Sequence, residues 1–581
     1  MAKKKPVEKK PPQVVVETAE SMAQKQREIS VSEFFLKNRH LLGFDSPRKA
    51  LLTGVKEAVD NSLDACEEGG ILPEISVDIL QTAADRFRVS VTDNGPGIVR
   101  NQIPKIFAKL LYGSKFHRLR MSRGQQGIGI SAAGMYGQLT TGTSTRILAK
   151  VKSSKKAHRI EVQIDTRANK PTILVDEEFD WKPTFIPVKP DGKEGRPIEY
   201  RHGTCVTIDM EAAFVRGRLS VDEYLKQCAI VNPHLQLHYR LALLKKEEPA
   251  SVAGRAEAGA RRPRSAPAAT DETKMSFYRA VNKLPEPPAE IKPHPHGVEL
   301  GVLMQMLKDS TARTLRSALT TDFSRVGDRS ALEICERAGL NPKANPTRIA
   351  HQESEALYKA IQESKLMRPP TDCLSPIGEQ AIVAGLKKEI EADYYTATTR
   401  EPEVYRGNPF QIEVGLAYAK PDPKQDIGAE EPVRVLRFAN RVPLLYQAGA
   451  CAMTDAVTGV NWKAYGLSQP RDGLPLGPMV VLVHMASVWV PFTSESKEAV
   501  AHYPEIVKEI TFALQECGRQ LSVYLSRRRR AAEAERKRSY IELYIPHLAL
   551  GLKEILDLTD REEKSVINRL SKMLEKTHLD V

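Results

Sequence analysis

Residues 56–65 read KEAVDNSLDA, a segment in which acidic and amide side chains alternate with apolar ones. Glu57 and Asn61 are four residues apart, so in a helix they share one face, with Asp60 and Asp64 on flanking rows. Asn61 offers a neutral oxygen that suits a hard cation such as Mg²⁺. Glu57, one turn earlier, is placed to deprotonate a water molecule. Taken alone, the segment also fits a solvated acidic face.

The residues around this segment predict where the helix begins and ends. Ser46 and Pro47 are typical of a helix start, with serine as the cap and proline in the first turn. Gly69 and Gly70 are a typical stop. The pattern therefore predicts one helix between these two signals, with apolar residues on its packing side.

A strand with a glycine-rich exit follows. The stretch FRVSVTDNGPGI, residues 87–98, alternates apolar and polar residues as a half-buried strand does. It ends in Asp93, followed by two glycines of which Gly97 is the second. A carboxylate at a strand end can accept an amino hydrogen, while glycine lets the backbone approach a flat ring. By itself this sequence is also a common turn.

Two further elements suit a nucleotide. SRGQQGIGISAAGMYG, residues 122–137, places Gly124, Gly127 and Gly129 before a helix predicted over 131–137, and amides at a helix N-terminus bind phosphate. A lone glycine-rich loop is weak evidence. GxxxxGK[ST] is absent from the sequence, which excludes a Walker-type ATPase. In YRHGTCVTIDM, Thr204 leads a strand and is expected near the purine.

Composition limits the class of protein. The chain has 581 residues, too many for one core, and 41% hydrophobic with 27% charged residues is typical of a globular protein. The net charge of +13 favours a polyanionic partner, although a solvated basic surface explains it equally well. Seven scattered cysteines without a CxxC pair fit a reducing cytosol. No apolar run reaches the ~20 residues that cross a bilayer, so no membrane association is expected.

Together, the four elements in this order resemble the Bergerat-type ATP-binding fold of gyrase, heat-shock chaperones, histidine kinases and mismatch-repair ATPases. The resemblance implies that Glu57 polarises the attacking water, that Asn61 holds Mg²⁺, and that Asp93 bonds the adenine amino group. It also implies ATP and Mg²⁺ as cofactors. The polar face of the helix would then be the floor of a nucleotide site.

Longer segments resemble the B subunit of DNA topoisomerase VI, a type IIB enzyme, over about residues 28–530. These segments include EIKPHPHGVELG, CLSPIGE, NWKAYGLSQP and VWVPFTSESKEAVAHYPEI. The implied fold is α+β and multidomain. It comprises a Bergerat-type α/β sandwich, a helical helix–two-turns–helix domain and an α/β transducer domain with a long C-terminal helix.

The resemblance and the composition shifts together predict five regions. These are a basic flexible arm (1–28), the ATPase domain (29–296, with an exposed loop at 245–274), the helix–two-turns–helix domain (297–372), the transducer domain (373–530) and a charged helical extension (531–581). The extension is expected to continue toward the A subunit. The alternative is that it packs on its own transducer.

Further site residues come from the resemblance alone. Lys497, in FTSESKEA, matches the transducer lysine that reaches the γ-phosphate. Trp462, Lys463 and Tyr465, in NWKAY, match a motif on a loop that faces DNA, although outside the family Trp462 would be assigned to the core and Lys463 to solvent. The residues expected around the phosphates and beside the nucleotide are Ser114, Lys115, Gly124, Gln125, Gln126, Gly127, Ile128, Gly129, Ile130 and Ser131.

The function implied is the ATP-hydrolysing half of a DNA strand-passage enzyme. ATP binding would close two B subunits around duplex DNA, and an A subunit in an A2B2 complex would cleave it. Such a protein would act in the cytoplasm on the nucleoid. A chaperone or mismatch-repair ATPase would share the nucleotide site without the KPHPHG and VPFTSESK segments. A catalytically silent DNA clamp is a different class, and the presence of Glu57 argues against it.

Overall fold

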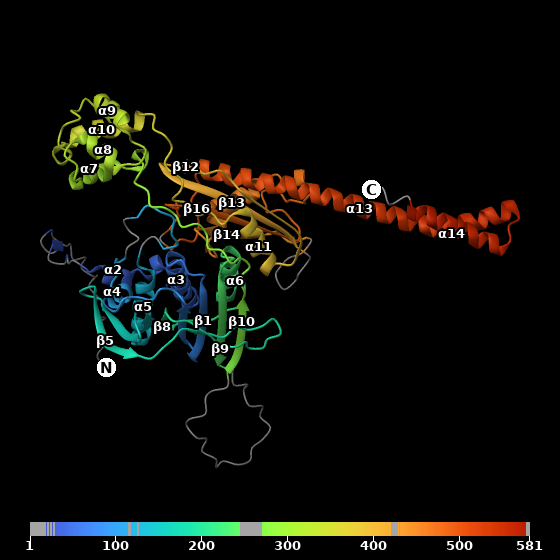
Figure 1. The fold of residues 1–581 in the computed structure, drawn as a ribbon, viewed down its shortest axis with the longest axis horizontal. Helices are drawn as coiled ribbons and strands as arrows, with labels where there is room; N and C mark the ends of the chain where they lie inside the picture. Colours follow the sequence, from blue (N-terminus) through green and yellow to red (C-terminus); the bar gives the residue numbers. More distant parts are fainter. Residues whose placement is uncertain are drawn as a thin grey trace, which may run out of the picture.

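Two large sheets, a cluster of short helices and one long helical arm make up the molecule (Figure 1). The computed structural model describes residues 29–113, 118–124, 127–244, 270–419, 430–494 and 496–576, with the single positions 19, 22, 23, 26 and 428. Within these residues no helix is long and apolar enough to cross a membrane.

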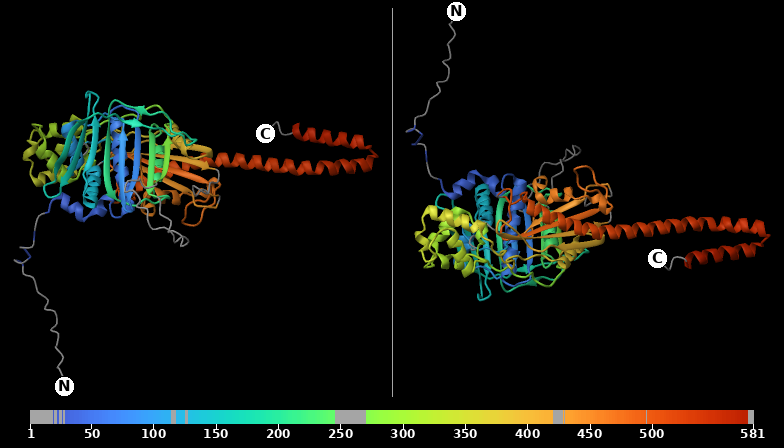
Figure 2. Two further views of the ribbon diagram at one scale, coloured as in Figure 1. Left: turned by 90° about the horizontal axis from the view of Figure 1, so that it is seen from below. Right: turned by 90° about the horizontal axis from the view of Figure 1, so that it is seen from above.

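The first sheet has eight strands in the order β10-β9-β1-β2-β8-β3-β4-β5. Its strands are β1 (Glu74–Ala83), β2 (Arg86–Asp93), β3 (Thr145–Lys150), β4 (Ala157–Asp165), β5 (Lys170–Phe179), β8 (Gly203–Glu211), β9 (Gln236–Leu244) and β10 (Thr270–Phe277). Only β1 and β9 pair in parallel. Seen from below, the strands lie in front of the helices (Figure 2, left), so the helices cover one face.

The helices on that face are α3 (Pro47–Glu68), α4 (Ile103–Ala108), α5 (Gly129–Thr141) and α6 (Val221–Val231). The predicted ends of the first helix are confirmed, because the Ser46 side chain accepts the Lys49 N–H and Gly69 is the C-cap. Strand β2 alternates buried and half-buried side chains as predicted, and its final residue, Asp93, is buried. The strand therefore delivers a carboxylate into the space between sheet and helices.

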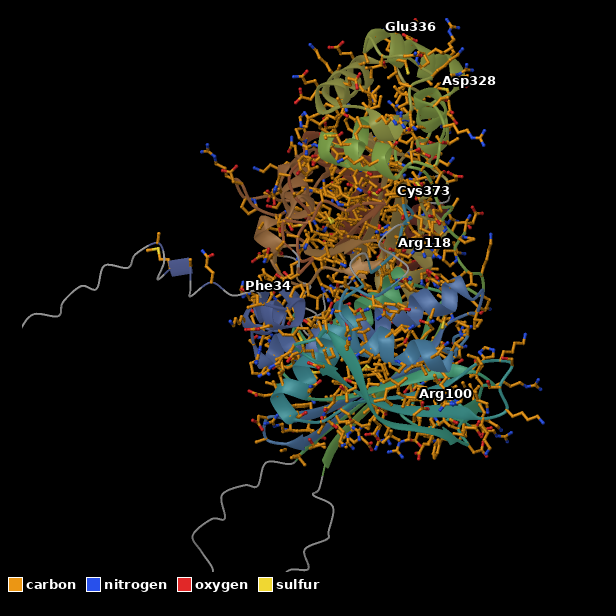
Figure 3. The ribbon with its side chains drawn as sticks, turned by 90° about the vertical axis from the view of Figure 1, so that its left-hand side faces the viewer. Phe34, Arg100, Arg118, Asp328, Glu336 and Cys373 are labelled. Atoms are coloured by element: carbon orange, nitrogen blue, oxygen red, sulfur yellow. The ribbon has the colours of Figure 1, made fainter. Side chains whose placement is uncertain are left out.

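A separate helical cluster follows, with helices α7 (Leu300–Asp309), α8 (Leu315–Asp322), α9 (Asp328–Arg337) and α10 (His351–Glu363). Its own core includes Leu303 and Leu307. In Figure 3 the labelled Asp328 and Glu336 lie at the end of the molecule far from Arg100, which begins a short 3-10 helix after β2.

The second large sheet has the order β11-β13-β16-β14-β15, with β12 paired to β13. Its strands are β11 (Ala392–Thr399), β12 (Glu403–Tyr405), β13 (Asn408–Ala419), β14 (Arg434–Ala439), β15 (Val442–Pro443) and β16 (Met479–Ser487). Every residue of β16 is buried. Helices α11 (Glu379–Glu389), α12 (Ala452–Gly459) and α13 (Pro504–Leu556) pack on this sheet.

The long helix α13 has 53 residues and so spans about 80 Å. Its first half packs on the second sheet, and the rest projects from the body (Figure 1). Helix α14 (Asp560–Lys576) folds back along it (Figure 2). The boundary expected at residue 530 lies inside α13, which continues without a break to Leu556.

Several sequence-based expectations fall outside the described residues. They concern most of the N-terminal arm, residues 245–269 of the predicted loop, and the positions Ser114, Lys115, Gln125 and Gln126. The end of that loop was predicted wrongly, because residues 270–274 pair with β9 as part of strand β10.

Candidate active site

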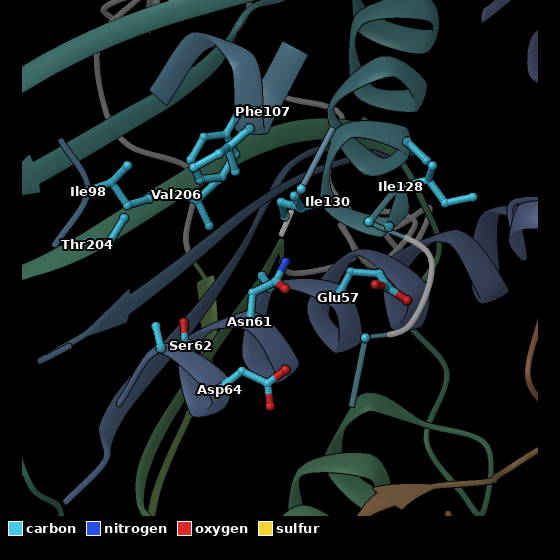
Figure 4. Close-up of a pocket in the computed structure, with 18 of the residues that line it drawn as sticks. Glu57, Asn61, Ser62, Asp64, Ile98, Phe107, Ile128, Ile130, Thr204 and Val206 are labelled. Atoms are coloured by element: carbon cyan, nitrogen blue, oxygen red, sulfur yellow. The ribbon is translucent and has the colours of Figure 1, made fainter. Parts of the chain in front are cut away.

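A cavity of about 610 Å³ opens between α3, α5 and the first sheet, a volume typical of small-molecule sites. In Figure 4, Glu57, Asn61 and Asp64 rise from α3, facing Ile98, Phe107, Thr204 and Val206 on the opposite wall. The apolar wall suits a flat ring and the glycine-lined side suits charged groups. The predicted site residues that line the cavity from the ATPase domain are Glu57, Asn61, Asp93, Gly97, Gly124, Gly127, Ile128, Gly129, Ile130 and Thr204.

Asp93 sits at the apolar end of the cavity with three hydrogen-bond donors around it. Its Oδ1 accepts the N–H groups of Gly95 (2.9 Å) and Thr204 (3.1 Å), and its Oδ2 accepts the Ser62 hydroxyl (3.0 Å). Burial raises the pKa of Asp93 to about 6, with these hydrogen bonds acting in the opposite direction. The carboxylate is therefore held in one orientation and is ionised at neutral pH.

The loop after Asp93 is anchored by Asn94 and packs closely on the backbone at Lys150. Asn94 Oδ1 accepts the Glu74 N–H at 2.9 Å and its Nδ2 donates to the Leu72 carbonyl at 3.1 Å. Gly97 has φ +76°, and a Cβ there would lie 2.2 Å from the Lys150 carbonyl oxygen. Only glycine fits this position.

The polar side chains of α3 differ in whether they face the cavity. Glu57 and Asn61 face the cavity as predicted, but Asp60 does not. Its Oδ1 accepts the Tyr224 hydroxyl at 3.0 Å in a buried contact, and burial raises its pKa to about 7. Asp64 lies at the cavity edge and accepts a hydrogen bond from Arg123 Nη1 at 2.8 Å. The prediction that the whole polar face is one site floor was therefore too simple.

Helix α5 begins two residues earlier than predicted, at Gly129. A Cβ at Gly129 would lie 1.7 Å from Glu57 Oε2, so the first turn of α5 touches the Glu57 carboxylate. The first N–H groups of a helix have no partner within it and can bind anions. The Ser131 side chain is not among the cavity-lining groups; it is fully buried and donates to the Ile128 carbonyl at 3.0 Å. The backbone N–H of Ser131, like the others in the first turn of α5, suits a phosphate.

Lys497 reaches the same cavity from the loop that follows the second sheet. Its φ is +55°, a left-handed conformation that costs a non-glycine residue about 1–3 kcal/mol. The loop is closed behind it by a bridge between Phe492 and Val500 and by a hydrogen bond from the Thr493 N–H to the Ala499 carbonyl (2.9 Å). A cation from one sheet's loop thus lies beside the acidic helix of the other.

Arg123, just before the glycine-rich loop, is a residue that the sequence analysis did not single out. Its side chain is 4% exposed. It donates to Asp64 Oδ1 (2.8 Å), to both oxygens of Glu67 (2.7 and 2.9 Å) and to Asn232 Oδ1 (2.6 Å). Burial alone would raise the pKa of Glu67, but Arg123, His234 and Arg441 outweigh it and hold the pKa well below its usual range. This cluster ties the root of the loop to the end of α3.

The turn between β14 and β15 joins the same cluster from the second sheet. Asn440 Nδ2 donates to the Ser122 carbonyl at 2.9 Å, and Arg441 Nη1 lies 3.5 Å from Glu67 Oε2. Arg441 Nη2 also donates to the Ser375 carbonyl at 2.8 Å. The junction continues where Arg118 and Cys373 lie in Figure 3, with the Met121 N–H donating to the Cys373 carbonyl at 3.1 Å. The two sheets are therefore connected beside the cavity.

The NWKAY segment lies far from the cavity. Trp462 is fully buried and its Nε1 donates to the Val457 carbonyl at 2.8 Å. Tyr465 packs closely against Gly518 of α13, whereas Lys463 is exposed. Of the three residues, Lys463 alone is placed for an electrostatic contact with a partner.

The lining of the cavity suits a Mg²⁺ ion that arrives bound to phosphate. Across the described ranges, no three histidine, cysteine, aspartate or glutamate side chains gather as a metal centre. Mg²⁺ usually keeps several waters and binds through one or two protein oxygens plus substrate phosphates. Asn61 offers one such oxygen at the polar end of the cavity.

Comparison with known proteins places this arrangement in a class. A family model described as "Histidine kinase-, DNA gyrase B-, and HSP90-like ATPase" matches residues 47–178, and the model "Topoisomerase VI B subunit, transducer" matches residues 369–537. The fold and the cavity therefore define an ATP-binding GHKL-type domain coupled to a transducer domain.

Relatives that match most of this chain identify the family within that class. The B subunit of type 2 DNA topoisomerase 6 from Methanosarcina acetivorans is 48% identical, covering 93% of this chain and 79% of the relative. Its counterpart from Archaeoglobus fulgidus is 44% identical over 94% of this chain and 83% of its own, and that from Natronomonas pharaonis is 33% identical over 96% and 86%. This chain belongs to the topoisomerase VI B subunits, the ATPases of type IIB DNA topoisomerases.

Proposed function

We propose that the chain uses ATP to close two copies of itself around duplex DNA while an A subunit cleaves that DNA in an A2B2 complex. The observation that carries the proposal is that Lys497, from the transducer, lines the same cavity as Glu57 and Asn61. A cation positioned there can bind the γ-phosphate and so distinguish ATP from ADP. The nucleotide state would then set the transducer's position.

The nucleotide roles follow the geometry of the cavity. Asp93 accepts the adenine amino group, and Ile98, Phe107 and Val206 pack on the ring. Asn61 would hold Mg²⁺, which neutralises phosphate charge when bound. Glu57 orients and deprotonates the attacking water. The N–H groups at the start of α5, with the loop from Gly124, cradle the phosphates. Ser114, Lys115, Gln125 and Gln126 are proposed beside them on family resemblance alone.

The partners are proposed on charge and exposure. A net charge of +13 suits phosphate contacts that carry no base sequence, with Lys463 as one candidate. The far end of the α13–α14 arm carries large exposed apolar side chains, among them Leu543, Ile555 and Leu556. Such a patch marks a protein interface, and we assign it to the A subunit. The complex would act in the cytoplasm on the nucleoid.

The proposal is tested by reconstitution with an A subunit. ATP, but not ADP, is expected to support relaxation of supercoiled plasmid, and covalent protein–DNA adducts should form on the A subunit only. The B subunit alone should bind duplex DNA in a salt-sensitive way without cleaving it. Label attached to this chain in a denaturing gel would contradict the division of labour.

Lys497→Ala is expected to uncouple nucleotide binding from strand passage. Without the ammonium group, the transducer no longer senses the γ-phosphate. A non-hydrolysable ATP analogue, which is expected to double the sedimenting mass of the native chain, should therefore not do so for this variant. Relaxation should fall by at least about tenfold, the effect of one lost charge-assisted hydrogen bond. Lys463→Ala, an exposed lysine outside the cavity, is the control for dimerisation. Normal closure by Lys497→Ala would remove the proposed role.

ATP affinity is expected to depend on pH through Asp93. Because its folded-state pKa is about 6, protonation at lower pH removes an acceptor, and affinity should fall up to tenfold per pH unit below 6. Fluorescent-nucleotide titrations from pH 5 to 8 test this change in affinity, and Asp93→Asn should bind ATP weakly without the pH dependence. The effect of Asp93 on folding stability has the opposite sign. Because its pKa is raised in the folded chain, Asp93 contributes stability below its unfolded value of about 3.9, and this contribution is lost as pH rises through 6.

A further inference from the structure

The residue next to Lys497 makes an ion pair that links the transducer to the catalytic helix. Glu498 is buried, with its side chain 8% exposed, and it pairs with Lys49 Nζ, whose side chain is 15% exposed. Lys49 lies in the first turn of α3, two turns before Glu57. Burial alone would lower the pKa of Lys49, but hydrogen bonding and attraction to Glu498 raise it above its usual value.

A second contact reinforces this link. Lys49 Nζ lies 5.2 Å from the centroid of the Tyr446 ring, and Tyr446 follows β15 of the transducer sheet. A small cavity between α3 and the transducer is bounded by these same groups, with both Lys497 and Glu498 in its wall. Lys49 is thus the point on α3 at which two separate transducer segments meet.

The turn that carries Lys497 is closed locally, and the next residue, Glu498, reaches α3. The Lys497 backbone is in the left-handed region, which a lysine does not adopt without outside support. The hydrogen bond that closes its own turn, from the Lys497 N–H to the Ser494 carbonyl (3.1 Å), fixes the turn but not its place relative to α3. Glu498 is the adjacent side chain with a charged partner on α3 itself.

We propose that Lys49 and Glu498 are positioning residues that hold the loop tip against α3 and thereby present Lys497 to the γ-phosphate. This inference rests on the proposed role of Lys497 and adds to it the contact that sets its position. The pair does not line the nucleotide cavity, so its loss should leave the binding of adenine and of the first two phosphates intact.

The two partners are expected to differ in effect. Without Glu498, the Lys49 ammonium still has an ion-pair partner, because its Nζ lies 3.4 Å from Asp45 Oδ1. Without Lys49, a buried carboxylate remains beside Lys497 and Lys56, two cations that border the same small cavity. The Glu498 carboxylate then competes with the γ-phosphate for Lys497. Lys49→Met should therefore impair recognition of the γ-phosphate more than Glu498→Gln.

The test compares equilibrium binding of a non-hydrolysable ATP analogue and of ADP to the full chain. The measured quantity is the ratio of the two affinities, which a general loss of stability would not change selectively. Glu498→Gln should reduce that ratio about tenfold, Lys49→Met should reduce it further, and Lys49→Arg should retain most of it. ADP affinity should stay within about twofold of the native value in all three. The matched control is Asp176→Asn. Asp176 lies on β5, and the change removes its exposed ion pair with Arg100.

A combined variant separates this inference from the proposed function. Lys497→Ala should abolish the preference for the analogue, and adding Glu498→Gln should then have no further effect, because the pair acts through Lys497. If Lys497→Ala loses the preference while Glu498→Gln keeps it, the positioning role is refuted and the role of Lys497 stands. An additive loss in the combined variant also refutes positioning. If Lys497→Ala keeps the preference, the proposed role of Lys497 itself is wrong.

Discussion

Glu57→Ala is expected to reduce ATP hydrolysis by about 10²–10⁴-fold, the usual contribution of a positioned general base. Nucleotide binding should survive, because Asp93 and the apolar wall of the cavity are unchanged. Steady-state hydrolysis by the purified chain, set against binding of a fluorescent ATP analogue, measures the two effects separately. Near-normal turnover would show that another group activates the water.

Two further variants sharpen that result. Asn61→Ala should instead weaken the binding of Mg²⁺–ATP, because it removes the oxygen proposed to hold the cation. Gly129→Ala should resemble the Glu57 variant, since its Cβ would lie 1.7 Å from Glu57 Oε2 and must displace that carboxylate. Gly142→Ala is not a suitable control, because its φ of +73° brings strain of its own. Gly301→Ala, on α7 with open space around it, is the matched control.

Arg123→Leu is expected to lower the free energy of unfolding of the nucleotide-binding region by about 3–5 kcal/mol. The change leaves Asp64 and Glu67 in a buried site without their main cation, and removing one partner of a buried pair costs far more than the pair contributes. Arg123→Lys keeps a charge but not the forked geometry, so an intermediate loss is expected.

Urea unfolding followed by far-UV circular dichroism measures this effect in the first transition, because a multidomain chain need not unfold in one step. The matched control is Arg88→Leu. Arg88 is 41% exposed and pairs with Asp209, which keeps Arg146 as a second partner, so a loss of at most about 1 kcal/mol is expected. Equal losses in the two variants would contradict the burial of the Arg123 cluster.

The pH dependence of this cluster has a definite sign. The pKa of Glu67 is held well below its usual range in the folded chain. Its contribution to stability is therefore present above the unfolded value of about 4.3 and is lost as pH falls toward the folded value. The difference in the free energy of unfolding between the native chain and Arg123→Leu should therefore be present at neutral pH and shrink under acid conditions.

Much of the cavity lining was predictable because the signals for it are local. Ser46 caps α3 through the N–H of Lys49, three residues away, and Asp93 is buried because it continues the alternation of β2. The glycine requirement at Gly97 comes from a positive φ and a close approach of backbone. Family resemblance added Lys497, which no periodicity or capping pattern would have found. The roles proposed for Glu57, Asn61, Asp93 and Lys497 stay predictions. Those of Ser114, Lys115, Gln125 and Gln126 stay predictions as well.

The sequence by itself determined the helix, the strand and the glycine turns, since each depends on residues within one or two turns of one another. Tertiary structure alone decided which acidic residues of α3 face the cavity: Asp60 bonds Tyr224, which is 164 residues away, and Asp64 pairs with Arg123, 59 residues away. The same holds for Lys49 and Glu498. A buried carboxylate needs a hydrogen-bond donor, and tertiary folding can supply that donor from a distant part of the chain. Local sequence patterns therefore do not predict which residue it will be.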